Sequence, residues 1–272
     1  MTLARHERDW QDLAEFDPLW AVLGANAIHR TEWDVEAFMA KGRSEAEGAL
    51  ADMRRLGLPL SNDAALDFGC GVGRLDGPLA EHFGAVVGLD ISTAMLEQAE
   101  RLNAGVANVR FVHNARPDLA VLDPQRFDLV YCRLVLQHMP SAAVAAGYIA
   151  EFVRVLAPGG LAFFEVTEHI PRRHRLQPQR RLYAGLRALG LPPRLLFRRL
   201  RLQPERMISI PEPAVRAAIL GAGGVVVEDE SRRSRGGAVK HRYWVTLPGA
   251  SLSASSDGSS AAMRSASAQS SG

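Results

Sequence analysis

The stretch Ala64-Ala65-Leu66-Asp67-Phe68-Gly69-Cys70-Gly71-Val72-Gly73-Arg74 decides the fold of this chain. Its apolar start predicts a short buried strand, and its glycine-dense part predicts a tight turn that leads into a helix. The glycines permit backbone angles that other residues avoid, and they let the main chain lie directly against a ligand. Free N–H groups at the start of the helix favour polar or anionic groups. The stretch therefore predicts a ligand-binding turn.

Two acids frame this turn. Asp67 comes just before it, and Asp90 ends a second predicted strand over Ala85–Leu89. An acid at about this distance downstream binds the ribose hydroxyls in dinucleotide-binding folds. The two acids and the turn together predict a site for a nucleoside-containing cofactor.

The sequence excludes two common phosphate-binding motifs. The nicotinamide fingerprint G-x-G-x-x-G requires a third glycine where this chain has Arg74. A P-loop requires Gly-Lys-Ser/Thr after its glycines, and that sequence is absent.

The pattern Asp-x-Gly-x-Gly-x-Gly, followed by an acid at the end of the next strand, resembles the class I S-adenosylmethionine-dependent methyltransferases. Later segments resemble the same family in the expected order. Phe127–Cys132 resembles its fourth strand, Leu134–Pro140 the loop after that strand, and Glu151–Glu165 a helix, a Pro-Gly-Gly turn and the fifth strand. The resemblance covers Asp34–Thr167 well and the rest of the chain in outline.

Strand and helix patterns alternate along the chain, which predicts an α/β fold with a doubly wound, mostly parallel sheet. The resemblance implies seven strands in a Rossmann-like methyltransferase fold, of which one is antiparallel. Helices are expected at 74–83, 93–102 and 142–156. Strands are expected at 64–68, 85–89, 109–113, 127–132, 160–167, 225–228 and 242–247.

Composition divides the chain into five segments. Residues 1–57 are expected to form an N-terminal helical cap, and residues 58–170 the S-adenosylmethionine-binding core. An arginine-rich helical insertion is expected at 171–211, and the end of the sheet at 212–248. Residues 249–272 are rich in Ser and Ala with few large apolar side chains, so a disordered tail is predicted.

The resemblance implies S-adenosyl-L-methionine as the cofactor and a set of residues that hold it. Asp90 is expected to accept hydrogen bonds from both ribose hydroxyls, because a carboxylate can accept from two donors. Ile91 and Met95 are expected beside the adenine, where the amide of Asn114 replaces the acid common in the family. The full expected cofactor set is Asp67, Gly69, Cys70, Gly71, Gly73, Asp90, Ile91, Met95, Asn114, Ala115, Cys132 and Arg133.

Methyl transfer from a sulfonium is an in-line displacement, so the protein mainly aligns the nucleophile and excludes water. A base matters where the nucleophile must lose a proton. His138 is the first candidate, because it follows the predicted fourth strand. The alternative is that its ring caps the helix that begins near Ser141. Weaker candidates are Glu165, Glu168 and His169.

The N-terminal aromatic residues have two interpretations. They form an apolar roof over the cofactor, or they pack between helices. Trp33 is the strongest candidate for the roof, because it immediately precedes a helix of the N-terminal cap that is expected to act as a lid over the cofactor. The others are Trp10, Trp20 and Phe38.

Charge is segregated although the net charge is only +2. Acids are frequent between Glu7 and Asp52, and arginines dominate between Arg172 and Arg206. The two regions neutralise each other, or the arginines (Arg180, Arg181 and Arg187 among them) receive an anionic substrate, or the basic stretch 181–189 lies on a membrane surface.

The predicted function is methylation of a small molecule, with oxygen favoured as the acceptor atom. An RNA methyltransferase that uses the arginine-rich segment and a non-catalytic protein that binds a partner remain alternatives. Amino-methylating nucleic-acid enzymes and cytosine C5 enzymes are disfavoured, because Cys132-Arg133-Leu134-Val135 lacks the former's Asn/Asp-Pro-Pro pattern and Tyr131 precedes Cys132. Nucleic acid is therefore not the expected substrate.

Other features of the sequence concern the location of the protein, its cysteines and metal binding. No apolar run is long enough to span a membrane, and MTLARHERDW at the N-terminus lacks a hydrophobic signal region. A cytoplasmic location is expected. The two cysteines, Cys70 and Cys132, are interpreted as small apolar lining, and no metal site is expected because no Cys/His cluster has metal-ligand spacing.

Overall fold

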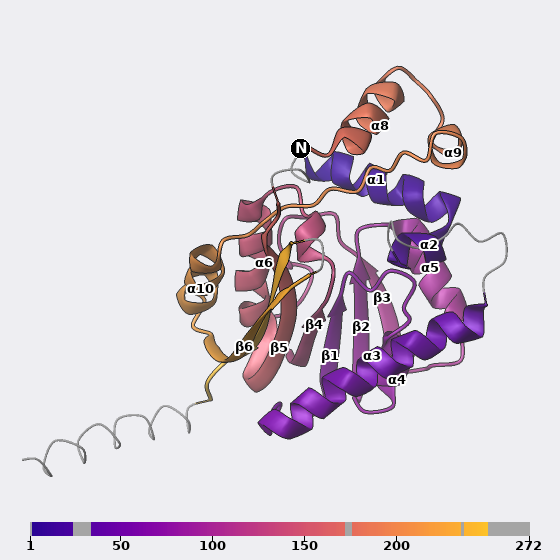
Figure 1. The fold of residues 1–272 in the computed structure, drawn as a ribbon. Coiled ribbons are helices and arrows are strands. Elements are labelled where there is room, and N and C mark those ends of the chain that lie inside the picture. The colour runs from indigo at the N-terminus through magenta and orange to yellow at the C-terminus, as the bar shows by residue number, and fades with distance from the viewer. Residues whose placement is uncertain (1, 24–33, 172–175, 235–236, 250–272) are drawn as a thin grey trace, which may run out of the picture.

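A seven-stranded sheet forms the centre of the computed structural model, which describes residues 2–23, 34–171, 176–234 and 237–249 (Figure 1). The strand order is β3-β2-β1-β4-β5-β7-β6, and β7 alone runs antiparallel to its neighbours. This confirms the predicted doubly wound sheet with one antiparallel strand. The strands are β1 (Ala64–Phe68), β2 (Ala85–Asp90), β3 (Val109–His113), β4 (Phe127–Cys132), β5 (Leu156–His169), β6 (Val225–Arg233) and β7 (Val239–Thr246).

β2 ends one residue later than predicted, and three other strands differ more from their predicted bounds. β5 starts at Leu156 because that residue pairs with Phe127, and the ladder resumes at Leu161 after a bulge where Gly159 takes a left-handed φ of 77°. β6 and β7 are longer than expected because they pair with each other through the backbone from Val225 to Arg233. Such backbone pairing does not require an apolar sequence.

Helices cover both faces of the sheet. α3 (Val35–Leu56), α4 (Asp76–Ala80) and α5 (Thr93–Leu102) lie on one face, and α6 (Ala142–Val155) and α10 (Glu212–Gly221) on the other (Figure 1). Alternate strand residues point to opposite faces, so Ala65 and Leu129 pack with α3 while Leu66 and Val130 pack with α6. α4 is shorter than the predicted helix over 74–83.

A third layer lies above the carboxyl ends of the central strands (Figure 1). It combines the N-terminal helices α1 (Leu3–Phe16) and α2 (Pro18–Leu23) with α8 (Pro178–Ala188) and α9 (Pro193–Arg198) from the arginine-rich insertion. Their shared core includes Leu13, Trp20, Phe38, Tyr183 and Phe197. Trp20 and Phe38 therefore pack between helices, as the second interpretation of the aromatic residues proposed.

Opposite charges meet inside this layer. Asp12 on α1 forms an ion pair with Arg187 on α8 at 3.0 Å, and its carboxylate also accepts a hydrogen bond from the hydroxyl of Tyr183 at 3.1 Å. For this pair the neutralising interpretation is confirmed.

Some expectations lie beyond what the structure describes. Trp33 and residues 250–272 of the predicted tail fall outside the described residues. Among the helices in the described parts of the chain, none is both long and apolar enough to cross a membrane.

Candidate functional site

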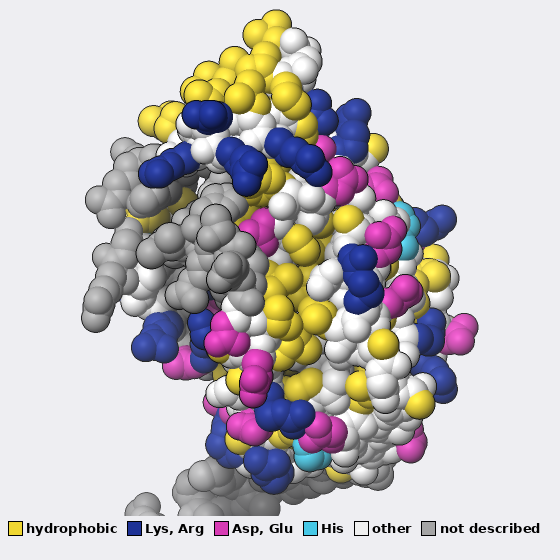
Figure 2. All heavy atoms as spheres, turned by 90° about the vertical axis from the view of Figure 1, so that its right-hand side faces the viewer, with side chains coloured by type: hydrophobic (Ala, Val, Ile, Leu, Met, Phe, Trp, Pro, Cys, Tyr) yellow, Lys and Arg dark blue, Asp and Glu magenta, His cyan; other side chains and the backbone are white. Residues whose placement is uncertain are grey.

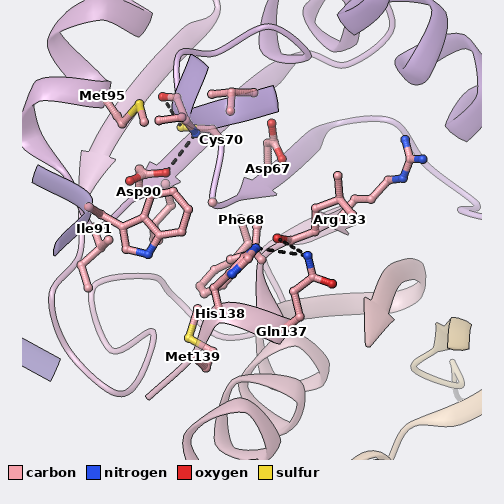
Figure 3. A pocket seen from close by; sticks show the side chains of 18 of the residues that line it. Asp67, Phe68, Cys70, Asp90, Ile91, Met95, Arg133, Gln137, His138 and Met139 are labelled. Atoms are coloured by element: carbon pink, nitrogen blue, oxygen red, sulfur yellow. Dashed lines mark hydrogen bonds between the residues drawn. The ribbon is translucent and has the colours of Figure 1, made fainter. Parts of the chain in front are cut away.

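A cavity of about 410 Å³ opens at the carboxyl ends of β1, β2 and β4, beneath α1. The glycine turn after β1 forms one wall, and the ends of β2 and β4 form others (Figure 3). Most of the predicted cofactor residues line it. They are Asp67, Gly69, Cys70, Gly71, Asp90, Ile91, Met95, Asn114 and Arg133.

The turn after β1 requires glycine at two positions in the cavity wall. Gly69 has a φ of 75°, and a Cβ placed there would lie 2.4 Å from a methyl carbon of Val135. Gly71 has a φ of 56° and lies against Val22. The N–H of Gly69 donates to the carbonyl of Leu89 at 2.7 Å, which ties the turn to β2. The turn therefore presents main chain rather than side chain to a ligand.

The carboxylate of Asp90 is held in the cavity wall by two backbone donors. Oδ2 accepts from the N–H of Gly71 at 2.9 Å (Figure 3), and Oδ1 accepts from the N–H of Ser92 at the same distance of 2.9 Å. Burial raises the pKa of this carboxyl, while the backbone donors oppose the increase. Each oxygen keeps a second lone pair, so the group can still accept from two neighbouring hydroxyls.

Asp67 is a second buried acid in the cavity wall, and Asp76 lies behind it, fully buried against Gly88. Burial raises the pKa of both carboxyls, and the charge of Asp67 raises that of Asp76 further. Two adjacent buried carboxyls favour a protonated form of one of them.

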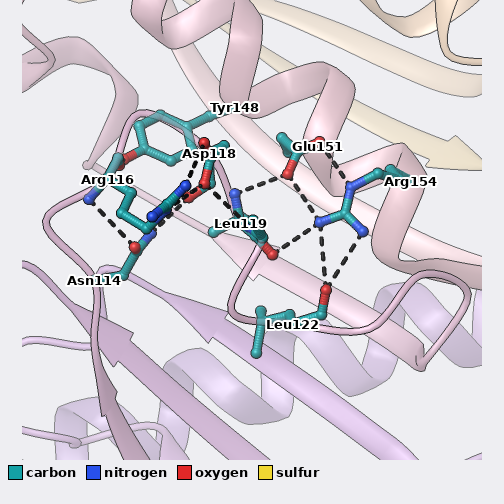
Figure 4. A network of polar contacts seen from close by, with 9 residues as sticks. Asn114, Arg116, Asp118, Leu119, Leu122, Tyr148, Glu151 and Arg154 are labelled. Carbon is teal, nitrogen blue, oxygen red and sulfur yellow. Dashed lines mark hydrogen bonds and ion pairs between the residues drawn. The ribbon is translucent and has the colours of Figure 1, made fainter.

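The loop after β3 forms another part of the wall, and its polar groups hold one another (Figure 4). The side-chain amide of Asn114 donates to the carbonyl of Asp118 at 2.8 Å, and its oxygen accepts from the N–H of Arg116 at 3.3 Å. Glu151 on α6 anchors the loop by accepting from the N–H of Leu119 at 2.7 Å. An adenine contact through Asn114 therefore competes with bonds that shape the loop.

Glu45 on α3 joins two arginines at one end of the cavity. Its carboxylate lies 2.6 Å from Arg74 and 2.6 Å from Arg133, and the hydroxyl of Tyr131 is 3.4 Å away. Glu45, Arg74 and Tyr131 were not predicted as site residues from the sequence. Glu45 belongs to a helix well ahead of the glycine turn, and no local pattern marked it.

Three predicted cofactor residues, Gly73, Ala115 and Cys132, are not among those that line the cavity. Gly73 faces α5 and β3 instead, where its carbonyl accepts from Asn103 and a Cβ would lie 2.9 Å from Phe111. Cys132 is buried in the core of the sheet. Burial also raises the pKa of its thiol.

His138 lines the cavity beside Gln137 (Figure 3), and both of its ring nitrogens are held. Nδ1 lies 2.6 Å from the carbonyl of Arg206, so this nitrogen carries the hydrogen, and Nε2 then accepts from the amide of Gln137 at 3.1 Å. Gln137 is oriented by Thr167, whose hydroxyl donates to its oxygen at 3.0 Å. Burial lowers the pKa of His138 to about 4. The ring is therefore neutral at pH 7 with its lone pair engaged.

The helix-capping interpretation of His138 is wrong. His138 lies in the short 3-10 turn η1 (Leu136–His138), and the following helix, α6, is capped by the hydroxyl of Ser141, which accepts from the N–H of Val144 at 3.2 Å.

The end of the cavity away from the glycine turn is lined by the N-terminal helix α1 and by the segment that follows α9. His6 and Trp10 come from α1, and Glu205 and Met207 come from the segment that follows α9. Trp10 packs edge-on against His138, with ring centroids 5.5 Å apart. Burial raises the pKa of Glu205 to about 7 and lowers that of His6 to about 3. Glu205 was not predicted as a site residue, because it stands alone at the end of an arginine-rich stretch.

The weaker base candidates are engaged elsewhere or exposed. Glu165 lies 2.7 Å from Lys240 and 3.3 Å from Arg242, Glu168 lies 3.4 Å from His241, and His169 is exposed. Of the described arginines between 176 and 206, none lines the cavity. In the described parts of the chain, no cluster of three or more His, Cys, Asp or Glu side chains has the arrangement of a metal site.

Known proteins are similar to this chain in part of the sequence and in fold. A methyltransferase-domain family model matches residues 65–160. The ubiquinone biosynthesis O-methyltransferase of Saccharophagus degradans is 34% identical over 111 residues, which are 40% of this chain and 45% of that protein. The enzyme of the same name from Ralstonia nicotianae is 37% identical over 120 residues, 43% of this chain and 49% of that protein. The chain thus spans about half the length of the curated relatives it matches.

Solved structures agree in fold. An S-adenosylmethionine-dependent methyltransferase from Leishmania major aligns with a TM-score of 0.60 at 16% identity, over 90% of this chain and 82% of that one. The magnesium protoporphyrin IX methyltransferase of Synechocystis aligns with a TM-score of 0.56 at 21% identity, over 88% of this chain and 97% of that one. With the strand order and the glycine turn described above, these matches show that the chain contains a methyltransferase domain at residues 65–160 and has the fold of S-adenosylmethionine-dependent methyltransferases.

Proposed function

We propose that this protein transfers a methyl group from S-adenosyl-L-methionine to a hydroxyl of a small molecule. The observation that supports this most directly is the position of Asp90, whose carboxylate is fixed in the cavity by the N–H groups of Gly71 and Ser92. This arrangement suits a ribose, because both carboxylate oxygens are held in the cavity wall and each keeps a lone pair that can accept from a hydroxyl.

The residues present fit the cofactor along the length of the cavity. Ile91 and Met95 provide apolar walls for the adenine beside Asp90. The glycine turn places no side chain in the way of the cofactor, and Asp67 faces the amino acid end of the cofactor. When bound, the cofactor supplies a methyl group already activated by its sulfonium charge. The protein then has to orient the acceptor and exclude water.

Trp10, His138 and Met207 form the walls around the acceptor in this proposal. His138 is a positioning residue and a poor base, because its Nε2 lone pair accepts from Gln137 and its pKa is about 4. Glu205 is the better proton acceptor. It lines the same end of the cavity, and a pKa of about 7 suits a general base near neutral pH.

An anionic acceptor has less support than a neutral one. Among the described residues that line the cavity, the cationic side chains are Arg74, Arg133 and Lys240. Each of them is already paired, the two arginines with Glu45 and the lysine with Glu165. The names of the curated relatives favour oxygen as the methylated atom.

Calorimetric titration with S-adenosyl-L-methionine tests the cofactor site in the wild type, Asp90→Ala and Asp123→Ala. Asp123 is an exposed acid away from the cavity and serves as the control. We expect micromolar binding by the wild type and the control, and a loss of about 100-fold or more in Asp90→Ala, from the loss of charge-assisted hydrogen bonds. No binding by the wild type would favour a non-catalytic role.

The acceptor is tested by transfer of a labelled methyl group to a panel of hydroxylated small molecules. Glu205→Gln should lower kcat with little change in cofactor affinity. Label found only on RNA would instead support the alternative of an RNA methyltransferase.

A further inference from the structure

Helices α8 and α9 form the tip of the third layer. This segment carries two sets of apolar side chains, one buried and one exposed. Tyr183, Leu196 and Phe197 point inward and pack in the core shared with α1. A second set of apolar side chains on the same segment faces solvent. This set, the tip leucines, consists of Leu176, Leu182, Leu189, Leu195 and Leu200.

The exposure of the tip leucines is large for a segment of this length. Leu189, between the two helices, is 77% exposed. Figure 2 shows hydrophobic side chains gathered at the top of the molecule, where α8 and α9 lie in Figure 1. A contiguous exposed apolar patch marks an interaction site more often than single exposed residues do.

The charge around the tip leucines has one sign. Residues 176–204 contain seven arginines and no Asp or Glu. Arg187 is paired with Asp12, whereas Arg194, Arg198, Arg199 and Arg201 are exposed. Figure 2 shows Lys and Arg side chains directly below the hydrophobic tip. Arginines beside exposed leucines are complementary to a layer that is anionic at its surface and apolar beneath.

We propose that the tip formed by α8, α9 and the turn between them docks peripherally on a bilayer with anionic headgroups. Leu189, Leu195 and Leu200 enter the headgroup region, and the exposed arginines lie against lipid phosphates. This proposal does not depend on the proposed activity. A spread of arginines without acids suits the diffuse charge of a lipid surface better than the mixed charge of a protein surface.

Vesicle co-sedimentation tests the tip leucines. The wild type should bind vesicles of mixed phosphatidylcholine and phosphatidylglycerol, and bind phosphatidylcholine alone much less. The double variant Leu189→Glu/Leu195→Glu should bind the anionic vesicles about tenfold or more weakly. Leu220→Glu is the matched control, because Leu220 is 76% exposed on α10, away from the tip.

A second pair of variants tests the arginines. Arg198→Gln/Arg199→Gln should weaken binding to anionic vesicles and flatten its dependence on salt, whereas Arg101→Gln on α5 should not. Circular dichroism and cofactor titration establish that each variant is folded.

Three results would overturn the proposal. They are equal binding to both kinds of vesicle, equal loss in Leu220→Glu, and a self-associating wild type that Leu189→Glu/Leu195→Glu makes monomeric. The last result would mean that a second copy of the chain covers the tip. Cofactor affinity is measured separately, so failure here is distinguishable from failure of the proposed activity.

Discussion

The carboxylate of Glu45 lies 2.6 Å from the guanidinium of Arg74, and the two side chains are only 11% and 12% exposed. Glu45 comes from α3, and Arg74 comes from the end of the glycine turn. The same carboxylate reaches Arg133 beyond β4. One acid therefore fixes α3 to two loops that border the cofactor cavity.

Replacing Glu45 by Gln should lower the free energy of unfolding by about 1–3 kcal/mol, because it leaves two partly buried guanidinium groups without a carboxylate. Cofactor affinity should fall as well, since both loops border the cavity. Urea denaturation measures the first effect and calorimetry the second. Glu81→Gln is the control, because its pair with Arg43 is about half exposed and water screens it, so its loss should affect stability much less. Equal losses in the two variants would contradict this role.

Substitution of Gly69 by Ala should cost about 2–4 kcal/mol of stability and most of the cofactor affinity. The φ of 75° is unfavourable for Ala, and the added Cβ would meet the side chain of Val135 at 2.4 Å. Thermal denaturation with and without S-adenosyl-L-methionine measures both effects. Gly105→Ala should change stability by less than about 0.5 kcal/mol, because a Cβ there meets nothing within 4 Å and its φ is not left-handed.

Stability should depend on pH through Glu205. Its pKa is about 7 in the folded protein and near 4.5 in the unfolded chain, so the folded state binds more protons between these values. The contribution of Glu205 to stability is present below pH 4.5 and is lost as the pH rises through 7. The free energy of unfolding of Glu205→Gln minus that of the wild type should therefore increase by about 1–3 kcal/mol between pH 4.5 and pH 8, in favour of the variant. Urea denaturation at the two pH values measures this, and parallel curves would refute it.

Reversal of the Asp12–Arg187 pair tests how the N-terminal helix holds the insertion. Arg187→Glu should destabilise the protein by about 1 kcal/mol or less, because Arg187 is 41% exposed and water screens the pair. The double variant Asp12→Arg/Arg187→Glu should recover part of this loss in thermal denaturation. Cofactor affinity should not change in either variant, since Asp12 and Arg187 do not line the cavity. A large loss of cofactor affinity would instead favour a direct role for Arg187 in binding.

The central part of the fold was predictable because its signals are local. β1, β3, β4 and α5 have the bounds expected from the sequence. Buried strands are marked by short apolar runs, and α5 begins after Ser92, whose hydroxyl caps it by accepting from the N–H of Met95 at 3.3 Å. The ends of β6 and β7 were not predictable, because backbone pairing with a neighbour defines them.

The cofactor end of the cavity was predictable for a related reason. Asp67 and Asp90 lie at the carboxyl ends of parallel neighbouring strands, and such ends meet at one edge of the sheet. Gly73 was misplaced because the pattern does not reveal which way each glycine of the turn faces. The structure turns it toward Asn103 and Phe111.

The sequence by itself determined the sheet, the glycine turn and the nucleoside end of the cavity, because periodicity and turn residues are properties of short segments. Only the tertiary structure decided the other end. It brings Trp10 and Glu205, nearly two hundred residues apart, to one cavity, and it engages His138 with Gln137 and the carbonyl of Arg206. Contacts between distant segments set the burial and hydrogen bonding of a side chain, and these set its protonation and its chemistry.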